Sequence, residues 1–238
     1  MRRTTLVAHR GRAGQGPENS VEAISDLPPW VDGVEVDARL NAEGIPVLMH
    51  DRTVDRTTDG TGEVEALSWS SLAALRVAGD GRVPTLAAYL DAATRTWLDP
   101  VLVDVKTAHL DALDAVVSTV RSAPVASRCV LLVRSERQLE RLRELDRPLR
   151  AALLGLSRSN AGQMFSAAET FDAEFLLLRP GDEEYLRSRS LVTEGRSRGV
   201  EVGASTINSD AALRAAYADG CTLVLTDRTT EYALVAKR

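Results

Sequence analysis

Residues 33–50 read Gly-Val-Glu-Val-Asp-Ala-Arg-Leu-Asn-Ala-Glu-Gly-Ile-Pro-Val-Leu-Met-His, which is two short apolar runs joined by a polar segment. The runs at 33–38 and 46–50 have the length and the apolar, β-branched content of strands. Runs of the same kind recur along the chain, and longer segments with helical periodicity lie between them. This alternation predicts an α/β protein built on a parallel sheet.

The connection between these first two runs is unusual. Eight residues separate Asp37 from Pro46, which is too few for the crossover helix that joins two parallel strands. We therefore expect a tight turn at residues 41–44 and an antiparallel pair. In that register Glu35 faces His50, and both lie on the same face as Asp37.

The expected strands outnumber the positions of a (β/α)8 barrel by one. They lie at Leu6–His9, Gly33–Ala38, Pro46–His50, Val101–Val105, Cys129–Arg134, Ala151–Leu156, Glu174–Arg179, Val200–Ala204 and Thr222–Thr226. The length of 238 residues is close to the roughly 250 typical of such a barrel. The sequence thus predicts a single TIM-type barrel domain over residues 1–238, with an irregular connection between its second and third strands.

Three segments have the apolar spacing of core-facing helices, namely Leu110–Arg121, Glu136–Leu145 and Asp210–Ala218. Gly220 follows the last of them and is typical of a helix C-cap. The segment Thr57–Gly62 is rich in threonine and glycine and predicts a loop. Coming soon after His50, this loop is either one wall of an active site or an ordinary surface excursion.

Composition excludes several classes of protein. The chain has 29 basic and 34 acidic residues, for a formal charge of −5, and it contains no basic run that would attract nucleic acid. Neither a signal-peptide apolar segment nor a run of 18 apolar residues is present. Cys129 and Cys221 lie in separate apolar runs, which indicates buried free thiols and a reducing compartment. We expect a soluble, cytoplasmic protein.

Two of the three histidines lie at the ends of expected strands. His9 ends the run Leu-Val-Ala-His, and His50 ends Val-Leu-Met-His, whereas His109 opens a helix. Barrel enzymes carry their catalytic groups at the carboxyl ends of strands. Together with the carboxylates Glu35 and Asp37, these imidazoles predict an acid/base pair beside a metal site.

Eight short motifs, in order along the chain, resemble those of the glycerophosphodiester phosphodiesterase family. They are His9-Arg10-Gly11, Pro17-Glu18-Asn19-Ser20, Glu35-Val36-Asp37, His50-Asp51, Thr57-Thr58-Asp59-Gly60, Val83-Pro84-Thr85-Leu86, Asp104-Val105-Lys106 and Leu225-Thr226-Asp227. The resemblance implies a barrel similar to phosphatidylinositol phospholipase C. It also implies hydrolysis of glycerophosphodiesters to glycerol 3-phosphate and an alcohol, with a bound divalent cation.

The resemblance assigns a role to each candidate residue. Carboxylate oxygens suit Mg²⁺ or Ca²⁺, which would be bound by Glu35, Asp37 and Asp104. The substrate phosphate would be contacted by Arg10 and Lys106, with Glu18 in support. His9 and His50 would remove one proton and supply another, in an order that the sequence leaves open. The nucleophile is either the neighbouring glycerol hydroxyl, through a cyclic phosphate, or water.

Some positions depart from the family pattern. Asp104 stands where the family usually has glutamate, which leaves the choice of metal open. The expected phenylalanine and tryptophan are replaced by Glu136 and Ser205, so we expect a wider and more polar pocket mouth. Arg134 and Arg179 end strands and either reach a further anionic group of the substrate or face solvent.

Three functions stay open at this point, and so does the oligomeric state. The first is the metal-dependent phosphodiesterase acting on a small glycerophosphodiester. The second is a lysophospholipase D-like activity on a diester that retains an acyl chain. The third is a protein that binds a phosphorylated glycerol without turnover, against which the two intact imidazoles argue.

Overall fold

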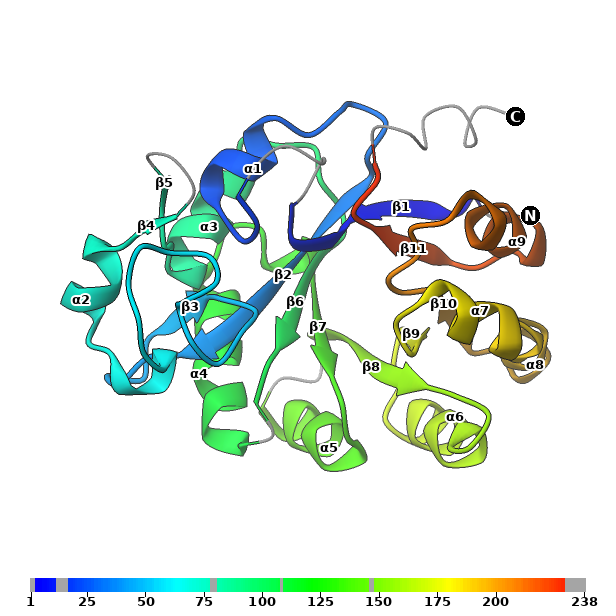
Figure 1. Cartoon of the computed structure of the whole chain (residues 1–238). Helices are drawn as coiled ribbons and strands as arrows, with labels where there is room; N and C mark the ends of the chain where they lie inside the picture. The colour runs from blue at the N-terminus through cyan, green and yellow to red at the C-terminus, as the bar shows by residue number, and fades with distance from the viewer. Residues whose placement is uncertain (1–2, 12–16, 78–80, 108, 146–147, 230–238) are drawn as a thin grey trace.

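Eight parallel strands form a closed barrel in the computed structural model, which describes residues 3–11, 17–77, 81–107, 109–145 and 148–229 (Figure 1). The strands are β1 Thr5–Ala8, β2 Gly33–Leu40, β6 Val101–Val105, β7 Cys129–Val133, β8 Arg150–Leu156, β9 Phe175–Leu178, β10 Glu201–Gly203 and β11 Leu223–Thr226. They follow the order β10-β9-β8-β7-β6-β2-β1-β11, and a parallel bridge between Ala204 and Val224 closes the circle. The predicted TIM-type barrel is confirmed.

Helices surround the strands on the outside (Figure 1). They are α1 Val21–Ser25, α3 Leu86–Ala93, α4 Leu110–Ser122, α5 Glu136–Leu145, α6 Ala161–Thr170, α7 Asp182–Ser188, α8 Ser190–Arg198 and α9 Asp210–Asp219. The three predicted helices correspond to α4, α5 and α9. Gly220 ends α9 in the left-handed conformation, with φ of +73°, as predicted.

Alternation along each strand separates two apolar layers. Side chains on the outer face pack under the helices, whereas the inner face fills the barrel with Val7, Leu102, Val130, Leu132, Ala152, Phe175, Leu177, Leu223 and Leu225. Because side chains alternate with a period of two, the next inner-face positions towards the carboxyl ends of β1, β6 and β11 are His9, Asp104 and Asp227. These polar residues therefore lie next to the inner apolar layer, at the carboxyl ends of the strands.

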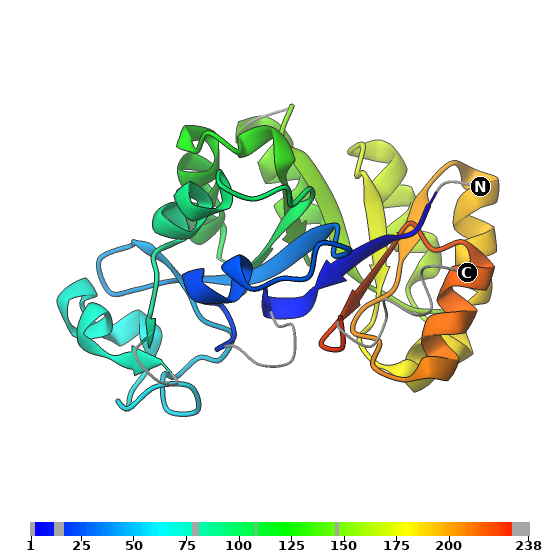
Figure 2. The same cartoon turned by 90° about the horizontal axis from the view of Figure 1, so that it is seen from above.

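The connection from β2 to β6 is a long excursion. It contains β3 Pro46–Leu48, the 3-10 turn η2 Val64–Ala66, α2 Trp69–Ala74, β4 Arg76–Val77 and β5 Gly81–Arg82. Figures 1 and 2 show it projecting from one side of the barrel. A small core of its own holds it together, made of Val47, Met49, Val54, Val64, Leu72, Val77 and Val83.

The predicted register of β2 with β3 is wrong by one residue. Ala38 pairs with Leu48, so Glu35 does not face His50. The loop runs through residues 41–45, one residue longer than predicted, because the Asn41 side chain accepts hydrogen bonds from the backbone of both Glu43 and Ile45. Loop length sets the register of a hairpin. β3 also ends at Leu48, so His50 lies in a bend beyond the strand.

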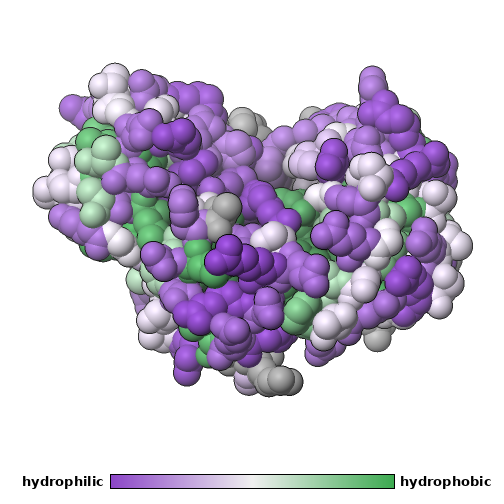
Figure 3. Space-filling model, turned by 90° about the horizontal axis from the view of Figure 1, so that it is seen from below, coloured by the Kyte–Doolittle hydropathy of each residue, from purple (hydrophilic) through white to green (hydrophobic). Residues whose placement is uncertain are grey.

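The molecular surface is mostly hydrophilic on the face shown in Figure 3, where hydrophobic residues form only small patches. Among the helices of the described residues, none is both long and apolar enough to cross a membrane. Cys129 and Cys221 are free and buried, as predicted, and burial raises the pKa of both thiols to about 12.

Candidate active site

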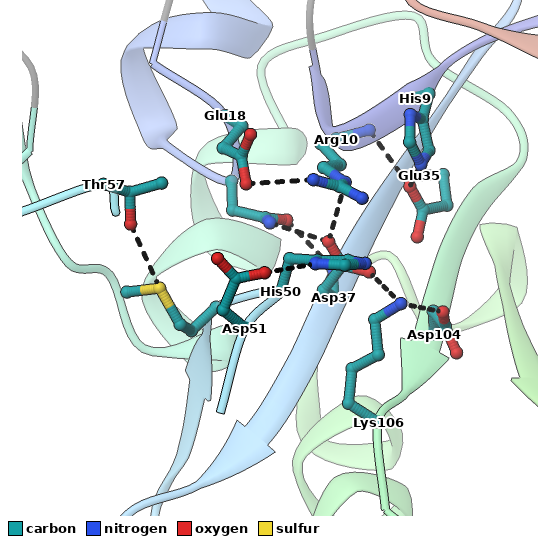
Figure 4. Close-up of polar contacts among 12 residues, drawn as sticks. His9, Arg10, Glu18, Glu35, Asp37, His50, Asp51, Thr57, Asp104 and Lys106 are labelled. Atoms are coloured by element: carbon teal, nitrogen blue, oxygen red, sulfur yellow. Dashed lines mark hydrogen bonds and ion pairs between the residues drawn. The ribbon is translucent and has the colours of Figure 1, made fainter. Parts of the chain in front are cut away.

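A cavity of about 240 Å³ lies at the carboxyl ends of the barrel strands. Its lining includes six of the predicted site residues, which are His9, Arg10, Glu35, His50, Asp104 and Lys106. The remaining two, Asp37 and Glu18, are buried beside it and contact the lining (Figure 4). All eight predicted residues therefore gather at one place, drawn from the ends of three strands and from the loops that follow β1 and β3.

His9 is oriented by Asp227, the residue after β11. The His9 Nδ1 atom lies 2.9 Å from Asp227 Oδ1, and the Asn208 side chain donates to the other oxygen of Asp227 at 2.8 Å. A carboxylate only accepts hydrogen bonds, so Nδ1 carries the hydrogen. In the neutral ring Nε2, which is 3.9 Å from Glu35 Oε2, then carries the lone pair and is the atom at which the imidazole can take up a proton.

His50 has a similar arrangement with its neighbour in the chain. Its Nδ1 lies 2.7 Å from Asp51 Oδ1. Burial lowers the pKa of His50, although the hydrogen bond with Asp51 opposes that effect. A hydrogen bond from Arg56 lowers the pKa of Asp51 to about 2. Each imidazole thus has a carboxylate on one nitrogen and leaves the other for chemistry.

Arg10 occupies a strained backbone conformation. Its φ of +55° lies in the left-handed region, which residues other than glycine rarely adopt. Its backbone N–H donates to Glu35 Oε2 at 3.0 Å, its Nη1 donates to Glu18 at 3.1 Å, and its carbonyl accepts from the Asn19 N–H at 2.9 Å. These contacts hold the strained turn in place, as is common at functional sites.

Three buried carboxylates lie together at the base of the site. Glu35, Asp37 and Asp104 each offer an oxygen, and these oxygens lie within 4.8 Å of one another. Sheet pairing explains this, since Asp37 pairs with Asp104 across β2 and β6. Burial, together with the charges of Asp37 and Asp104, raises the pKa of Glu35 well above its usual value. A buried set of oxygen donors that repel one another fits a divalent cation such as Mg²⁺ or Ca²⁺.

Besides Arg10, two basic side chains contact these carboxylates. Lys106 Nζ lies 2.8 Å from Asp37 Oδ1 and 2.7 Å from Asp104 Oδ2. Arg134 donates from both terminal nitrogens to Asp104, at 2.5 and 2.6 Å. Arg134 also lines the cavity, and its side chain is 39% exposed, so both alternatives for it stay open. Arg179 is exposed and contacts the carbonyl of Gly155.

Comparison with known proteins identifies the group to which this geometry belongs. The model of the glycerophosphoryl diester phosphodiesterase family matches residues 9–231. The chain belongs to this family. The resemblance read from the eight motifs is therefore confirmed.

Relatives of known name match a smaller part. Glycerophosphodiester phosphodiesterase 1 from Bos taurus is 45% identical over 82 residues, which cover 34% of this chain and 25% of the relative. A glycerophosphodiester phosphodiesterase from Caldanaerobacter subterraneus is 37% identical over 93 residues, covering 35% of this chain and 38% of the relative. The matched part thus spans about a quarter to two fifths of the length of these two relatives.

Solved structures match along the whole chain. A phosphodiesterase from Oleispira antarctica, in complex with the product sn-glycerol-3-phosphate, has a TM-score of 0.86 at 21% identity and covers 98% of this chain and 97% of its own. A glycerophosphodiester phosphodiesterase from Agrobacterium tumefaciens has a TM-score of 0.78 at 25% identity, covering 97% and 99%. The barrel fold is shared with both.

Two residues of the family motifs have roles that the sequence reasoning missed. Asn19 donates to Asp37 Oδ2 at 2.8 Å and accepts from the Asp37 N–H at 2.9 Å, so it fixes that carboxylate from both sides. Asp227 orients His9. Both stand in motifs that carry the family resemblance, which was a usable signal. Arg56 contacts Glu18 and Asp51 and lies next to another such motif. Its distance along the sequence from these two residues does not indicate the contacts.

Of the two positions expected at the pocket mouth, one lies in the cavity lining. Ser205 lines the cavity together with Thr206. Glu136 is exposed in the first turn of α5 and is not part of the lining. The prediction for Glu136 is therefore wrong, because the chain turns into α5 before that side chain can face the barrel axis.

Proposed function

We propose that this chain is a metal-dependent phosphodiesterase that hydrolyses glycerophosphodiesters to glycerol 3-phosphate and an alcohol. One observation carries the proposal: two imidazoles, each bonded through Nδ1 to a carboxylate, line one small cavity with three carboxylates at its base. We also propose that the barrel and its excursion act as one domain, in the cytoplasm.

The two histidines supply the proton transfers of the reaction. One imidazole takes the proton from the attacking hydroxyl, whether of glycerol or of water, and the other gives a proton to the leaving alkoxide. The hydrogen bonds to Asp227 and Asp51 select the tautomer that leaves Nε2 available in each ring. Both steps then take place in the same cavity.

Groups at the base of the site would neutralise the negative charge of the substrate phosphate. A divalent cation held by Glu35, Asp37 and Asp104 would neutralise charge on a non-bridging oxygen. Arg10 lies on the same side, where its guanidinium suits bidentate contact with a phosphate. Lys106 lines the cavity and adds a further positive charge.

The cavity favours a small substrate. Its volume of about 240 Å³ is below the range of roughly 300 to 1,000 Å³ that is usual for pockets of drug-sized ligands. Leu132, Leu154 and Leu225 line it, with Ser205 and Thr206 as polar members. This supports a water-soluble glycerophosphodiester over a lysophospholipid, whose acyl chain would need more apolar wall.

A direct assay separates the three functions. Release of glycerol 3-phosphate is measured from glycerophosphocholine, and release of lysophosphatidic acid from lysophosphatidylcholine, each with added Mg²⁺ or Ca²⁺ and again with EDTA. We expect release from glycerophosphocholine only with the cation. Faster release of lysophosphatidic acid from lysophosphatidylcholine favours the lysophospholipase D-like activity, and binding of glycerol 3-phosphate without turnover favours the binding protein. Full activity after exhaustive chelation contradicts metal dependence.

A further inference from the structure

We propose that Arg56 is a positioning residue that couples the acid/base histidine His50 to the phosphate-binding residue Arg10. This inference rests on the proposed function, since it assigns a role within the same site. Arg56 belongs to the loop that follows β3, and its guanidinium bridges two carboxylates from different parts of the chain. Each of those carboxylates holds one of the two functional side chains.

The contacts of Arg56 are charge-assisted on both sides. Its Nε donates to Asp51 Oδ2 at 2.5 Å. Its Nη2 and Nη1 donate to the two oxygens of Glu18, at 2.6 and 3.1 Å. Arginine presents its donors in a fixed planar fork, which matches one bidentate and one single contact, whereas the point charge of lysine does not.

Each of the two carboxylates that Arg56 holds also bonds a functional side chain of the cavity. Asp51 Oδ1 bonds His50 Nδ1 at 2.7 Å, and Glu18 Oε1 accepts from Arg10 Nη1 at 3.1 Å. Arg10 in turn lies 3.4 Å from Asp37. A row of alternating charges therefore runs from His50 through Arg56 to Arg10 and ends at the carboxylate cluster (Figure 4 shows both ends of it).

The loop that carries Arg56 is itself anchored. The Thr58 hydroxyl and N–H both donate to the Val54 carbonyl, and the Gly62 N–H donates to the Asp55 side chain at 3.1 Å. The Thr57 hydroxyl donates to the sulfur of Met49, which lies in the core of the excursion (Figure 4). The excursion thus positions Arg56 against the barrel, which gives this long insertion a part in the site.

Loss of Arg56 should be visible at His50 without any substrate. His50 faces Asp51 and Asp37, which favour its charged form, and Lys106 and Arg10, which oppose it. Without Arg56 the charge of Asp51 is no longer balanced, so the imidazolium is stabilised and the pKa of His50 rises. The chain has three histidines, so NMR can follow each ring separately.

The first experiment compares the histidine titrations of the parent, Arg56→Met and Arg52→Met. Arg52 is the matched control, because it lies in the same segment and pairs with Glu63 while 70% exposed. We expect the His50 pKa to rise in Arg56→Met and to stay at the parent value in Arg52→Met. An unchanged His50 titration in a folded Arg56→Met variant overturns the proposal.

The second experiment measures hydrolysis of glycerophosphocholine. We expect kcat to fall about 10- to 100-fold in Arg56→Met, with a raised KM, because misplacement by about 1 Å can cost 10²-fold. Arg56→Lys should recover part of kcat, and Arg52→Met should keep the parent value. Equal kcat in Arg56→Met and Arg52→Met overturns the coupling. A parent chain without hydrolysis contradicts the proposed function alone, since the titration still decides the role of Arg56.

Discussion

His9 depends on Asp227 for the position of its proton. The carboxylate lies at 2.9 Å from Nδ1 and is held from behind by Asn208. An amide at this position can donate to Nδ1 and so stabilise the wrong tautomer. Replacing Asp227 should therefore affect the His9 tautomer and not the packing of the apolar core, to which neither Asp227 nor Asn208 belongs.

We therefore predict that Asp227→Asn lowers kcat for glycerophosphocholine by roughly 10²- to 10⁴-fold with little effect on the fold. Asp91→Asn is a suitable control, since the Asp91 side chain is 74% exposed, pairs with Arg95 and does not line the cavity. Steady-state kinetics and circular dichroism of both variants check this. A kcat for Asp227→Asn equal to that of Asp91→Asn would show that His9 does not need this partner.

At the scale of elements, β2 and β6 approach each other closely at Gly33. A Cβ atom there would lie 2.5 Å from the Pro100 carbonyl oxygen, which is backbone and cannot move aside easily. The Val34 N–H donates to that same carbonyl at 3.0 Å. The pairing that aligns Asp37 with Asp104 begins at this point.

Gly33→Ala should lower the free energy of unfolding by roughly 1 to 3 kcal/mol, as overpacking usually does. Gly162→Ala is the control, because that glycine lies in α6 with nothing within 4 Å of the added Cβ, and there alanine should stabilise by about 0.5 to 1 kcal/mol. Urea denaturation of both variants measures the difference. Equal midpoints would contradict the close approach.

Most elements could be predicted because the sequence pattern that specifies each of them lies within the element itself. The strands are short apolar runs, and a period of two places Glu35 and Asp37 on one face without any tertiary information. α4 and α5 bury leucine and valine at helical spacing, whereas three of the five residues that α6 buries, Ala161, Met164, Phe165, Ala167 and Ala168, are alanine. The sequence pattern did not predict α6.

What escaped prediction depends on distant or single-residue geometry. Arg56 meets Glu18 across 38 positions of the chain, so no local spacing reveals the contact. The register of β3 was missed because one loop residue, Ile45, is held by the Asn41 side chain. A period-two argument fails completely when the register shifts by one.

At the scale of the whole molecule, we expect the buried carboxylates to link stability to pH and to cations. Burial and its acidic neighbours raise the pKa of Glu35 well above the usual value near 4.5. Without a cation, the folded state keeps a proton on Glu35 at pH values where the unfolded state has lost it. The free energy of unfolding must then fall as pH rises from the usual pKa through the raised one.

We predict that in EDTA, as pH rises above the usual pKa of glutamate, the parent loses stability more steeply than Glu35→Gln, which has no proton to lose at that position. Mg²⁺ or Ca²⁺ should stabilise the parent by about 2.7 kcal/mol at a hundredfold excess over its Kd, and Asp37→Asn much less. Urea denaturation at several pH values measures both effects. Identical slopes for the parent and Glu35→Gln would contradict the raised pKa.

The central claim is that His9 and His50 act together on one diester. Its most direct test is kcat for glycerophosphocholine in His9→Ala, His50→Ala and the control His109→Ala, whose exposed histidine precedes α4 without bonding its backbone. The first two variants should fold and lose roughly 10² to 10⁴ in kcat, while His109→Ala keeps the parent value. A folded His9→Ala or His50→Ala variant within about threefold of the parent kcat would contradict the claim, since removing a general acid or base costs far more.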